Sequence, residues 1–253
     1  MTIDEIKAAL ADAGVENCYG EARILCEEFS GEALENAVAR RINREPLQYI
    51  IGRWPFYREE YFVSPACLIP RSDTEILVDH LVKNLKHGAR FLDLCTGSGC
   101  IAISLAKNRP DISGCAADIS DDALEIARKN ASHNGVAIDF FHTDVKKNAN
   151  MTEKFDCIVS NPPYIASDVV DTLDAELFKE PRIALDGGED GMDFYRAIVE
   201  NYKHLLSDDG FFAFEFGYDQ KASAAALASQ HGFKFTAIND YGGNFRVAIM
   251  EKQ

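Results

Sequence analysis

The sequence predicts an α/β protein in which a mostly parallel, seven-stranded sheet follows a small helical domain. From Arg90 onward, short apolar runs alternate with amphipathic stretches, which is the pattern of parallel strands joined by helical crossovers. The last two apolar runs, 233–238 and 245–250, are separated by only six residues. Such a short connection cannot form a right-handed crossover, so these two strands should pair antiparallel. Residues 1–45 show helical periodicity alone.

The first 45 residues are expected to form three short helices. Thr2-Ile3-Asp4-Glu5 fits a capping box, in which the Thr2 hydroxyl and the Glu5 carboxylate each accept a backbone N–H of the first turn. Apolar residues then recur at helical spacing until Gly14, a residue that commonly ends helices. Two more amphipathic stretches cover 21–29 and 32–42, before Pro46. We therefore expect a helical domain at 1–45.

Residues 46–70 are rich in β-forming side chains, among them Tyr49 and Ile50, and are interrupted by glycine and proline. This composition predicts a β-hairpin that links two domains. The run Ser72-Asp73-Thr74-Glu75 then fits a second capping box. It should open a helix over 73–86, so the larger domain is expected at 71–253.

The rest of the chain divides into strands and helices that alternate. The expected strands are 91–94, 112–117, 137–142, 155–160, 211–216, 233–238 and 245–250, and the expected helices are 101–107, 121–133, 192–206 and 220–230. A parallel α/β sheet closed by an antiparallel pair is a pattern found in methyltransferases of the Rossmann-like class.

Charge argues against nucleic acid as the main partner. The net charge is −15, with 41 acidic against 26 basic residues. A protein that binds a duplex normally carries a basic patch, because neutralising phosphates supplies much of its affinity. A basic protein partner is favoured instead.

Cysteine usage and hydropathy indicate an ordinary cytoplasmic protein. The seven cysteines are an odd number and include no C-x-x-C pair, so neither a disulfide framework nor a metal site is expected. The longest apolar runs are far shorter than the roughly 20 residues that cross a bilayer. The acidic, polar start Met1-Thr2-Ile3-Asp4-Glu5 does not resemble a signal peptide.

The turn Asp93–Gly99, between the first strand of the sheet and its helix, is a candidate cofactor site. Glycine lets the backbone turn sharply and approach a ligand, and the helix N-terminus beyond it offers free N–H groups. Asp118, which ends the next strand, can accept hydrogen bonds from both hydroxyls of a ribose. Asp144 follows the third strand and could face an adenine amino group or remain a solvated loop carboxylate. Gly97-x-Gly99-x-x-Ala102 also fits the dinucleotide fingerprint, so this turn alone leaves S-adenosylmethionine and NAD open.

Asn161-Pro162-Pro163-Tyr164 follows the fourth strand directly, so it lies on the same edge of the sheet as the turn. The Asn161 side-chain carbonyl and the Pro162 backbone carbonyl can both accept hydrogen bonds from one substrate NH₂. Two acceptors aim a planar nitrogen and favour the charge that builds on it during attack. The prolines hold the acceptors rigid, and Tyr164 offers a flat face for stacking. A rigid turn that merely ends a strand is the alternative. Together with the turn and Asp118, the motif predicts methyl transfer from S-adenosylmethionine to a planar, amide-like nitrogen.

Several segments resemble one family over nearly the whole chain. They are Glu45–Ile50, Leu68–Glu75, the turn Cys95–Gly99, the Asn161–Tyr164 motif, Glu180-Pro181, Ala184-Leu185 and Asp186–Gly188. They look like the HemK/PrmC family, the N5-glutamine methyltransferases of peptide chain release factors. The resemblance implies that the substrate is the glutamine in the Gly-Gly-Gln loop of class 1 release factors. It also implies that the small N-terminal domain grips the release factor.

The resemblance assigns residues to cofactor and substrate. S-adenosyl-L-methionine, and its product S-adenosyl-L-homocysteine, would be held by Cys95, Thr96, Gly97, Ser98, Gly99, Asp118, Val145 and Asn161, with Asp144 added from its position. The substrate side would comprise Asn161, Pro162, Pro163, Tyr164 and Arg71, of which Asn161, Pro162 and Tyr164 serve catalysis.

The sequence departs from the family pattern at three positions. Cys95 stands where the general turn has glycine, which requires a backbone conformation open to other residues. Ser72 stands where the family usually has proline, and serine is a competent helix cap. Val145 is aromatic in some relatives, so stacking on adenine is not predicted there.

Four other functions use some of the same features. A ribosomal-protein glutamine methyltransferase would share the chemistry, but the linker and Arg71 motifs favour release factors. An adenine-N6 methyltransferase would suit Asn161–Tyr164 equally, but the net charge of −15 argues against it. A non-catalytic cofactor-binding module has no use for two fixed acceptors. An NAD dehydrogenase would not need the terminal antiparallel strand.

Overall fold

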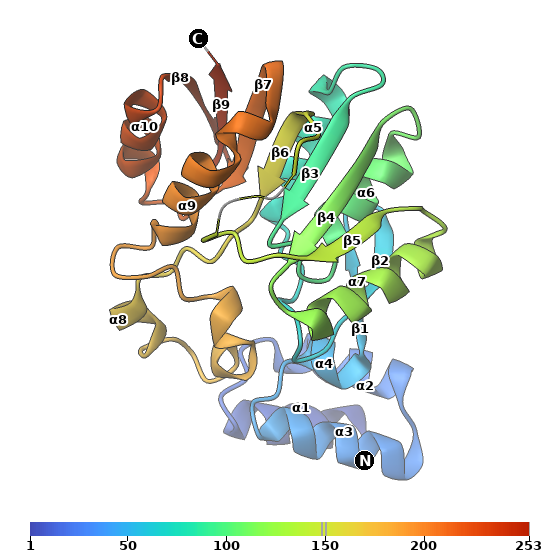
Figure 1. The fold of residues 1–253 in the computed structure, drawn as a ribbon. Helices are drawn as coiled ribbons and strands as arrows, with labels where there is room; N and C mark the ends of the chain where they lie inside the picture. The colour runs from blue at the N-terminus through green and yellow to red at the C-terminus, as the bar shows by residue number, and fades with distance from the viewer. Residues whose placement is uncertain (148, 150, 253) are drawn as a thin grey trace.

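A seven-stranded sheet in the order β5-β4-β3-β6-β7-β9-β8 forms the centre of the protein (Figure 1). The structure is a computed structural model and describes residues 1–147, 149 and 151–252. Neighbours from β5 to β7 pair parallel, whereas β9 pairs antiparallel with both β7 and β8. The predicted fold class is confirmed, and the last strand is inserted between β7 and β8.

The elements of the larger domain follow the predicted alternation. The strands of the sheet are β3 Arg90–Leu94, β4 Ser113–Asp118, β5 Asp139–His142, β6 Phe155–Ser160, β7 Leu206–Glu215, β8 Phe233–Asn239 and β9 Phe245–Lys252. The helices are α5 Thr74–Asn84, α6 Cys100–Asn108, α7 Asp121–Asn134, α8 Ser167–Val170, α9 Asp193–Tyr202 and α10 Lys221–Gln230, with short 3₁₀ turns η1 Leu177–Lys179, η2 Arg182–Ala184 and η3 Lys203–Leu205. Within the described part of the chain, no helix has both the length and the apolar character needed to cross a membrane.

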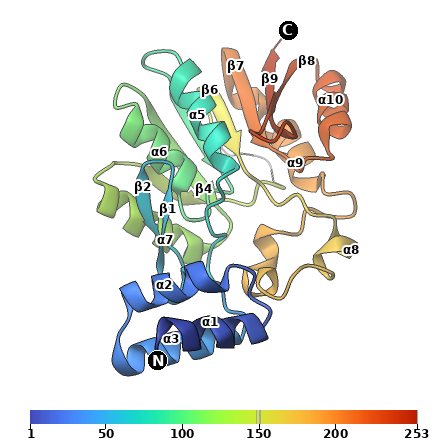
Figure 2. The same ribbon diagram turned by 180° about the vertical axis from the view of Figure 1, so that it is seen from behind.

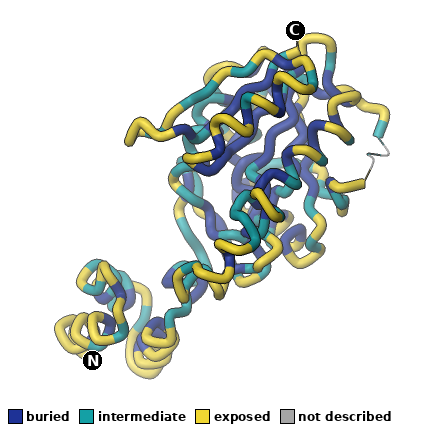
Figure 3. The backbone as a smooth tube through the Cα atoms, turned by 90° about the vertical axis from the view of Figure 1, so that its left-hand side faces the viewer, coloured by how far each residue is buried: buried dark blue, intermediate teal, exposed yellow. Residues whose placement is uncertain are grey.

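Alternation along the strands creates a core on each face of the sheet. Leu92 and Leu94 of β3 pack with α9 and α10 in one apolar cluster, whereas Phe91 packs with α5 and α6 in another. Residues two apart on a strand share a face, so a run that is apolar throughout can supply both cores. Figure 3 shows the central strands as the most continuously buried part of the chain.

Four helices at the N-terminus form a separate small core below the sheet (Figure 2). They are α1 Ile3–Asp12, α2 Cys18–Glu28, α3 Gly31–Ile42 and α4 Leu47–Ile51. The predicted capping box at Thr2 is confirmed: Thr2 N donates to Glu5 Oε2 over 2.7 Å, and Glu5 N to Thr2 Oγ1 over 3.3 Å. The prediction that residues 47–51 belong to the hairpin is wrong. They are helical because Leu47 and Ile50 are buried in the helical core.

The hairpin comprises β1 Arg53–Phe56 and β2 Glu59–Phe62, which pair antiparallel as predicted. It is anchored in the larger domain, since Phe56 and Tyr61 are buried with α5 and α6. Asn130 of α7 fixes its end, because the side chain accepts from Phe62 N over 2.7 Å and donates to Phe62 O over 3.0 Å. The predicted linker is therefore packed into the larger domain.

The predicted second capping box does not form. Helix α5 begins after Asp73, with no side-chain cap. The Glu75 carboxylate accepts instead from Tyr57 N over 2.9 Å, in the hairpin turn. Glu75 therefore binds the hairpin instead of forming the helix cap that the local sequence pattern predicted.

Candidate active site

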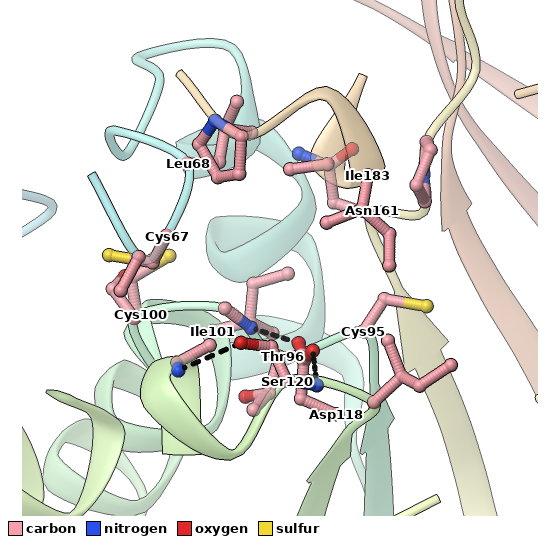
Figure 4. Close-up of a pocket in the computed structure, with 18 of the residues that line it drawn as sticks. Cys67, Leu68, Cys95, Thr96, Cys100, Ile101, Asp118, Ser120, Asn161 and Ile183 are labelled. Atoms are coloured by element: carbon pink, nitrogen blue, oxygen red, sulfur yellow. Dashed lines mark hydrogen bonds between the residues drawn. The ribbon is translucent and has the colours of Figure 1, made fainter. Parts of the chain in front are cut away.

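A cleft opens at the carboxyl ends of β3, β4 and β6, and Figure 4 shows its lining. It encloses about 890 Å³, a volume that includes the open solvent at its mouth. The lining comes from the segment 66–74, from the strand ends with the first turns of α6 and α7, from the segment 181–184, and from Phe194 of α9. Among the residues assigned to cofactor or substrate, those in the lining are Cys95, Thr96, Gly97, Ser98, Asp118, Asp144, Val145, Asn161, Pro163 and Arg71.

The glycines of the turn after β3 have the conformations that the sequence required of them. Gly97 has φ +54 with no atom within 4 Å of an added Cβ, so its backbone is open to a ligand. Gly99 has φ +82, and a Cβ there would lie 2.9 Å from Ile103 Cδ1 and 3.1 Å from Ala127 Cβ. Gly99 is outside the lining, and its role is to let α6 and α7 pack closely beneath the turn.

Cys95 differs from the expectation that its backbone would suit any residue. Its φ is +58, in the left-handed region that favours glycine. The side chain packs against the apolar cluster on the α9 face, and burial raises the pKa of the Cys95 thiol well above its usual range. The thiol is therefore neutral and unreactive, which agrees with the absence of any nucleophilic role in the prediction.

Asp118 ends β4 with its carboxylate directed at the turn. Oδ2 accepts from Gly97 N over 2.8 Å, and Oδ1 accepts from Ser120 N over 3.0 Å. Burial raises the pKa of Asp118, whereas these backbone hydrogen bonds lower it. Each oxygen has a second lone pair, so a half-buried acceptor of hydroxyl groups lies beside the open turn. These features fit the ribose of S-adenosylmethionine.

Asp144 and Val145 form the adjacent wall of the cleft. Asp144 Oδ1 accepts from Lys146 N over 3.0 Å, and its other oxygen lies 3.3 Å from Lys147 Nζ. Val145 is buried, and its carbonyl accepts from Asn201 Nδ2 over 3.0 Å. An apolar side chain beside a carboxylate suits the face and the amino group of an adenine ring.

Asn161 reaches the cleft from the end of β6, and its side chain is oriented by one contact. Asn161 Nδ2 donates to Thr74 Oγ1 over 3.1 Å. One N–H of the amide is thereby used, and no described residue donates to Oδ1. The side chain therefore offers its carbonyl oxygen as an acceptor, as the predicted chemistry requires.

Pro162 and Tyr164 lie outside the lining residues, unlike Asn161 and Pro163. Tyr164 packs against the apolar cluster, and burial raises the pKa of its hydroxyl to about 12. Two glycines allow the chain to pack closely against the backbone of Tyr164. A Cβ on Gly187 would lie 2.7 Å from Tyr164 Cα, and one on Gly191 would lie 2.2 Å from Tyr164 O. The segment 187–191 is therefore packed directly on the motif's backbone.

Arg71 lies at the mouth of the cleft and is paired with Glu180. Glu180 is 5% exposed, and its second oxygen accepts from Ile69 N over 3.0 Å. One buried carboxylate therefore joins the segment before α5 to the segment before η2. Both segments contribute to the lining.

Four residues of the site were not assigned a role from the sequence. Asp93 is fully buried and accepts from Thr96 Oγ1 over 2.6 Å and from Ala102 N over 3.2 Å, so it fixes the turn. Glu180 and Thr74 lie within motifs that carried the resemblance, and Thr74 was interpreted only as part of a helix cap. Glu215, at the end of β7, had no local signal beyond being an acid in an apolar strand.

The fold and this cleft define a Rossmann-like methyltransferase. Residues 71–206 match the family model described as methyltransferase small domain. The chain is 39% identical to a release factor glutamine methyltransferase of Agrobacterium fabrum, over 96% of this chain and 93% of that protein. It is 36% identical to one of Geobacter sulfurreducens, over 95% and 92%. The protein belongs to the release factor glutamine methyltransferase family.

Solved structures agree on the fold. A ribosomal protein L11 methylase from Lactobacillus delbrueckii superimposes with a TM-score of 0.56 at 22% identity, covering 76% of this chain and 84% of that one. The similarity concerns the architecture alone, because the methyltransferase sheet serves many substrates.

Proposed function

We propose that the protein transfers a methyl group from S-adenosyl-L-methionine to the side-chain amide nitrogen, N5, of the glutamine in the Gly-Gly-Gln loop of class 1 peptide chain release factors. The observation that carries the proposal is the orientation of Asn161. Its NH₂ donates to Thr74, so its carbonyl oxygen is the group presented beside the turn and Asp118.

The residues of the cleft divide the reaction between them. When bound, S-adenosyl-L-methionine supplies an electrophilic methyl group and leaves as S-adenosyl-L-homocysteine. Asp118 accepts from the ribose hydroxyls, while Asp144 and Val145 meet the adenine. Asn161 Oδ1 and the Pro162 carbonyl accept the two N–H bonds of the glutamine amide.

Catalysis on this view is orientation and electrostatic stabilisation. The amide nitrogen is a poor nucleophile because its lone pair is delocalised. Two acceptors hold it in line with the methyl carbon and favour the positive charge that develops as the N–C bond forms and the S–C bond breaks. The extra proton then leaves to water, so no strong base is required. We assign Tyr164 a packing role behind the acceptors rather than the stacking role first expected, because its side chain packs against the apolar cluster.

We infer that the helical domain contributes to recognition of the release factor. It is tied to the segment that covers the cleft, since Arg41 Nη2 lies 2.8 Å from Glu176 Oε1 and Arg44 Nη2 lies 2.9 Å from the same atom. The net charge of −15 supports a basic protein partner. Arg71, at the mouth of the cleft, is placed to contact the approaching loop.

The test is to incubate the protein with isotopically labelled S-adenosylmethionine and a class 1 release factor, then to locate the label by mass spectrometry. We expect one added methyl group on the glutamine of the Gly-Gly-Gln loop. The matched control is the same release factor with that glutamine replaced by alanine, which should acquire no label. Label at another residue, or equal label in the control, would refute the proposed substrate.

A further inference from the structure

The carbonyl of Asn161 can serve as an acceptor only while its amide faces one way. An asparagine amide has nearly equal dimensions on its two sides, and a half-turn would present NH₂ to the cleft. That donor would oppose the NH₂ of a glutamine amide. Whatever holds the amide in its present orientation therefore controls whether the acceptor exists.

Thr74 is in contact with the amide and is almost fully buried. It is 2% exposed at the first turn of α5, and its hydroxyl oxygen accepts from Asn161 Nδ2 over 3.1 Å. The carboxyl group of Glu215 lies beside the same side chain, and its interaction with Thr74 lowers the pKa of Glu215. A hydroxyl has one proton, so a threonine that accepts from Asn161 is free to donate to Glu215.

Glu215 is placed behind Thr74 by the sheet itself. It is the last residue of β7, which pairs with β6 so that Phe214 lies opposite Ser160, the residue before Asn161. The side chain is 1% exposed, and its Oε2 has no hydrogen-bond partner among the described residues. A buried acid at this position fits no cap, turn or surface ion pair.

We propose that Thr74 and Glu215 are positioning residues, which fix the amide of Asn161 with its carbonyl oxygen toward the substrate. The Asn161 NH₂ donates to the Thr74 hydroxyl, and we assign the proton of that hydroxyl to a hydrogen bond with the Glu215 carboxylate. An ionised carboxylate can only accept, so it determines the direction of the whole chain. This inference rests on the proposed role of Asn161 as the acceptor.

Protonation of Glu215 reverses the chain. A protonated carboxyl donates to Thr74, which can then donate to Asn161 Oδ1 and turn the amide over. Burial raises the pKa of Glu215 to about 7, while its interaction with Thr74 and the positive charge of Arg246 lower it. The other titratable or charged groups near the carboxyl are Asp73, Arg71, Tyr164, Tyr195 and Cys100. Catalysis should therefore weaken as the pH falls below about 7.

The kinetic experiment compares Thr74→Val with Thr74→Ser. Valine keeps the shape but removes the hydroxyl, so kcat should fall about 10- to 100-fold, the scale of a small misplacement at a reacting centre. The KM for release factor and the Kd for cofactor should remain near wild-type values, and serine should restore kcat. An undiminished kcat in Thr74→Val, or an equal loss in Thr74→Ser, would overturn the proposal.

A spectroscopic experiment tests the same chain without any substrate. The side-chain amide resonances of Asn161, identified by their loss in Asn161→Asp, should shift with an apparent pKa near that of Glu215. In Glu215→Gln, whose side chain neither gains nor loses a proton over this range, this titration should vanish. Persistence of the same titration in Glu215→Gln would disprove the role of Glu215. Because no release factor is present, this result is independent of whether the proposed substrate is correct.

Discussion

The edge of the sheet and the segments that cover it are held by different forces. Asp118 ends β4 and Asn161 directly follows β6. Both strands pair with β3 in register, so backbone ladders fix the positions of these residues. The covering segments, 66–74 and 165–190, join the sheet's edge through few regular contacts. One isolated bridge, Ile165 with Asp186, lies within the second of them.

Buried charges replace the ladder in the covering segments. Glu180 holds Arg71 and Ile69 N, while Glu176 meets Arg41, whose side chain is 2% exposed and is also bound by Glu21. Buried charged contacts add little net stability while they are complete, but removal of one partner is costly because the other charge stays buried. The positions of Asp118 and Asn161 therefore depend on the sheet, whereas the segments that cover the cleft depend on a few long-range ion pairs.

Removal of the acceptor at the sheet's edge should give the largest effect. We expect Asn161→Ala to lower turnover by roughly two to three orders of magnitude, the scale of losing one polar contact to a transition state. The measurement is single-turnover methylation of the release factor, with thermal unfolding as the control for folding. A variant that unfolds like wild type and methylates at the same rate would contradict the role of Asn161.

The raised pKa of Glu215 should make the free energy of unfolding depend on pH. Its pKa is raised by burial from 4.5 to about 7. The unfolded chain therefore loses this proton first, and the group's contribution to stability, full below pH 4.5, is lost as the pH rises through about 7. The loss amounts to roughly 3 kcal/mol.

The Glu215 prediction is checked by urea unfolding of wild type and Glu215→Gln from pH 4.5 to 8. Glutamine has no proton to lose, so the free energy of unfolding of the variant, relative to that of wild type, should increase from pH 4.5 to 8. Asp93, whose pKa burial also raises to about 7, is common to both proteins and cancels in the difference. Parallel stability curves would show that Glu215 keeps its ordinary pKa.

Asp118→Ala should weaken cofactor binding while leaving the sheet intact. Loss of hydrogen bonds to a charged group costs about 1.5–3 kcal/mol, which is roughly a 10- to 100-fold increase in Kd. Calorimetry with S-adenosylmethionine measures this directly, and Asp118→Asn, which keeps one acceptor, should fall between. Unchanged affinity in the alanine variant would place the ribose elsewhere.

Glu180→Ala tests the covering segments. It leaves Arg71 and Ile69 N without their acceptor, so we expect a loss of about 2 kcal/mol in stability and a raised KM for release factor with little change in cofactor affinity. Glu180→Gln keeps an acceptor for Ile69 N and should be milder. If Glu180→Ala weakened cofactor binding more than it raised the KM for release factor, the covering segments would not have a role separate from that of the sheet's edge.

Cys95→Gly should have the smallest effect. Glycine relieves the left-handed backbone, worth about 1–2 kcal/mol, but it loses a side chain that packs on the apolar cluster. The two nearly cancel, so the unfolding free energy should change by no more than about 1 kcal/mol. Cys95→Val, which keeps the packing but suits this conformation poorly, should be clearly less stable than the glycine variant.

Local patterns predicted the parts of the molecule that local forces control. Strand β6 and the helix cap at Thr2 match their predictions because one depends on an apolar run and the other on residues three apart. The errors occur where distant residues compete. Glu75 was expected to cap α5 but binds Tyr57, and residues 47–51 became helical by packing on α1–α3.

The sequence by itself determined the order of strands and helices along the chain, the glycine turn after β3, and the position of Asn161 directly after β6. These follow from periodicity, glycine conformation and the position of motifs at strand ends. The tertiary structure decided which way Asn161 faces, that Cys95 takes a left-handed backbone, and that Glu180 joins two covering segments. Such features depend on residues up to 111 positions apart, and no local pattern records a contact that only the folded chain creates.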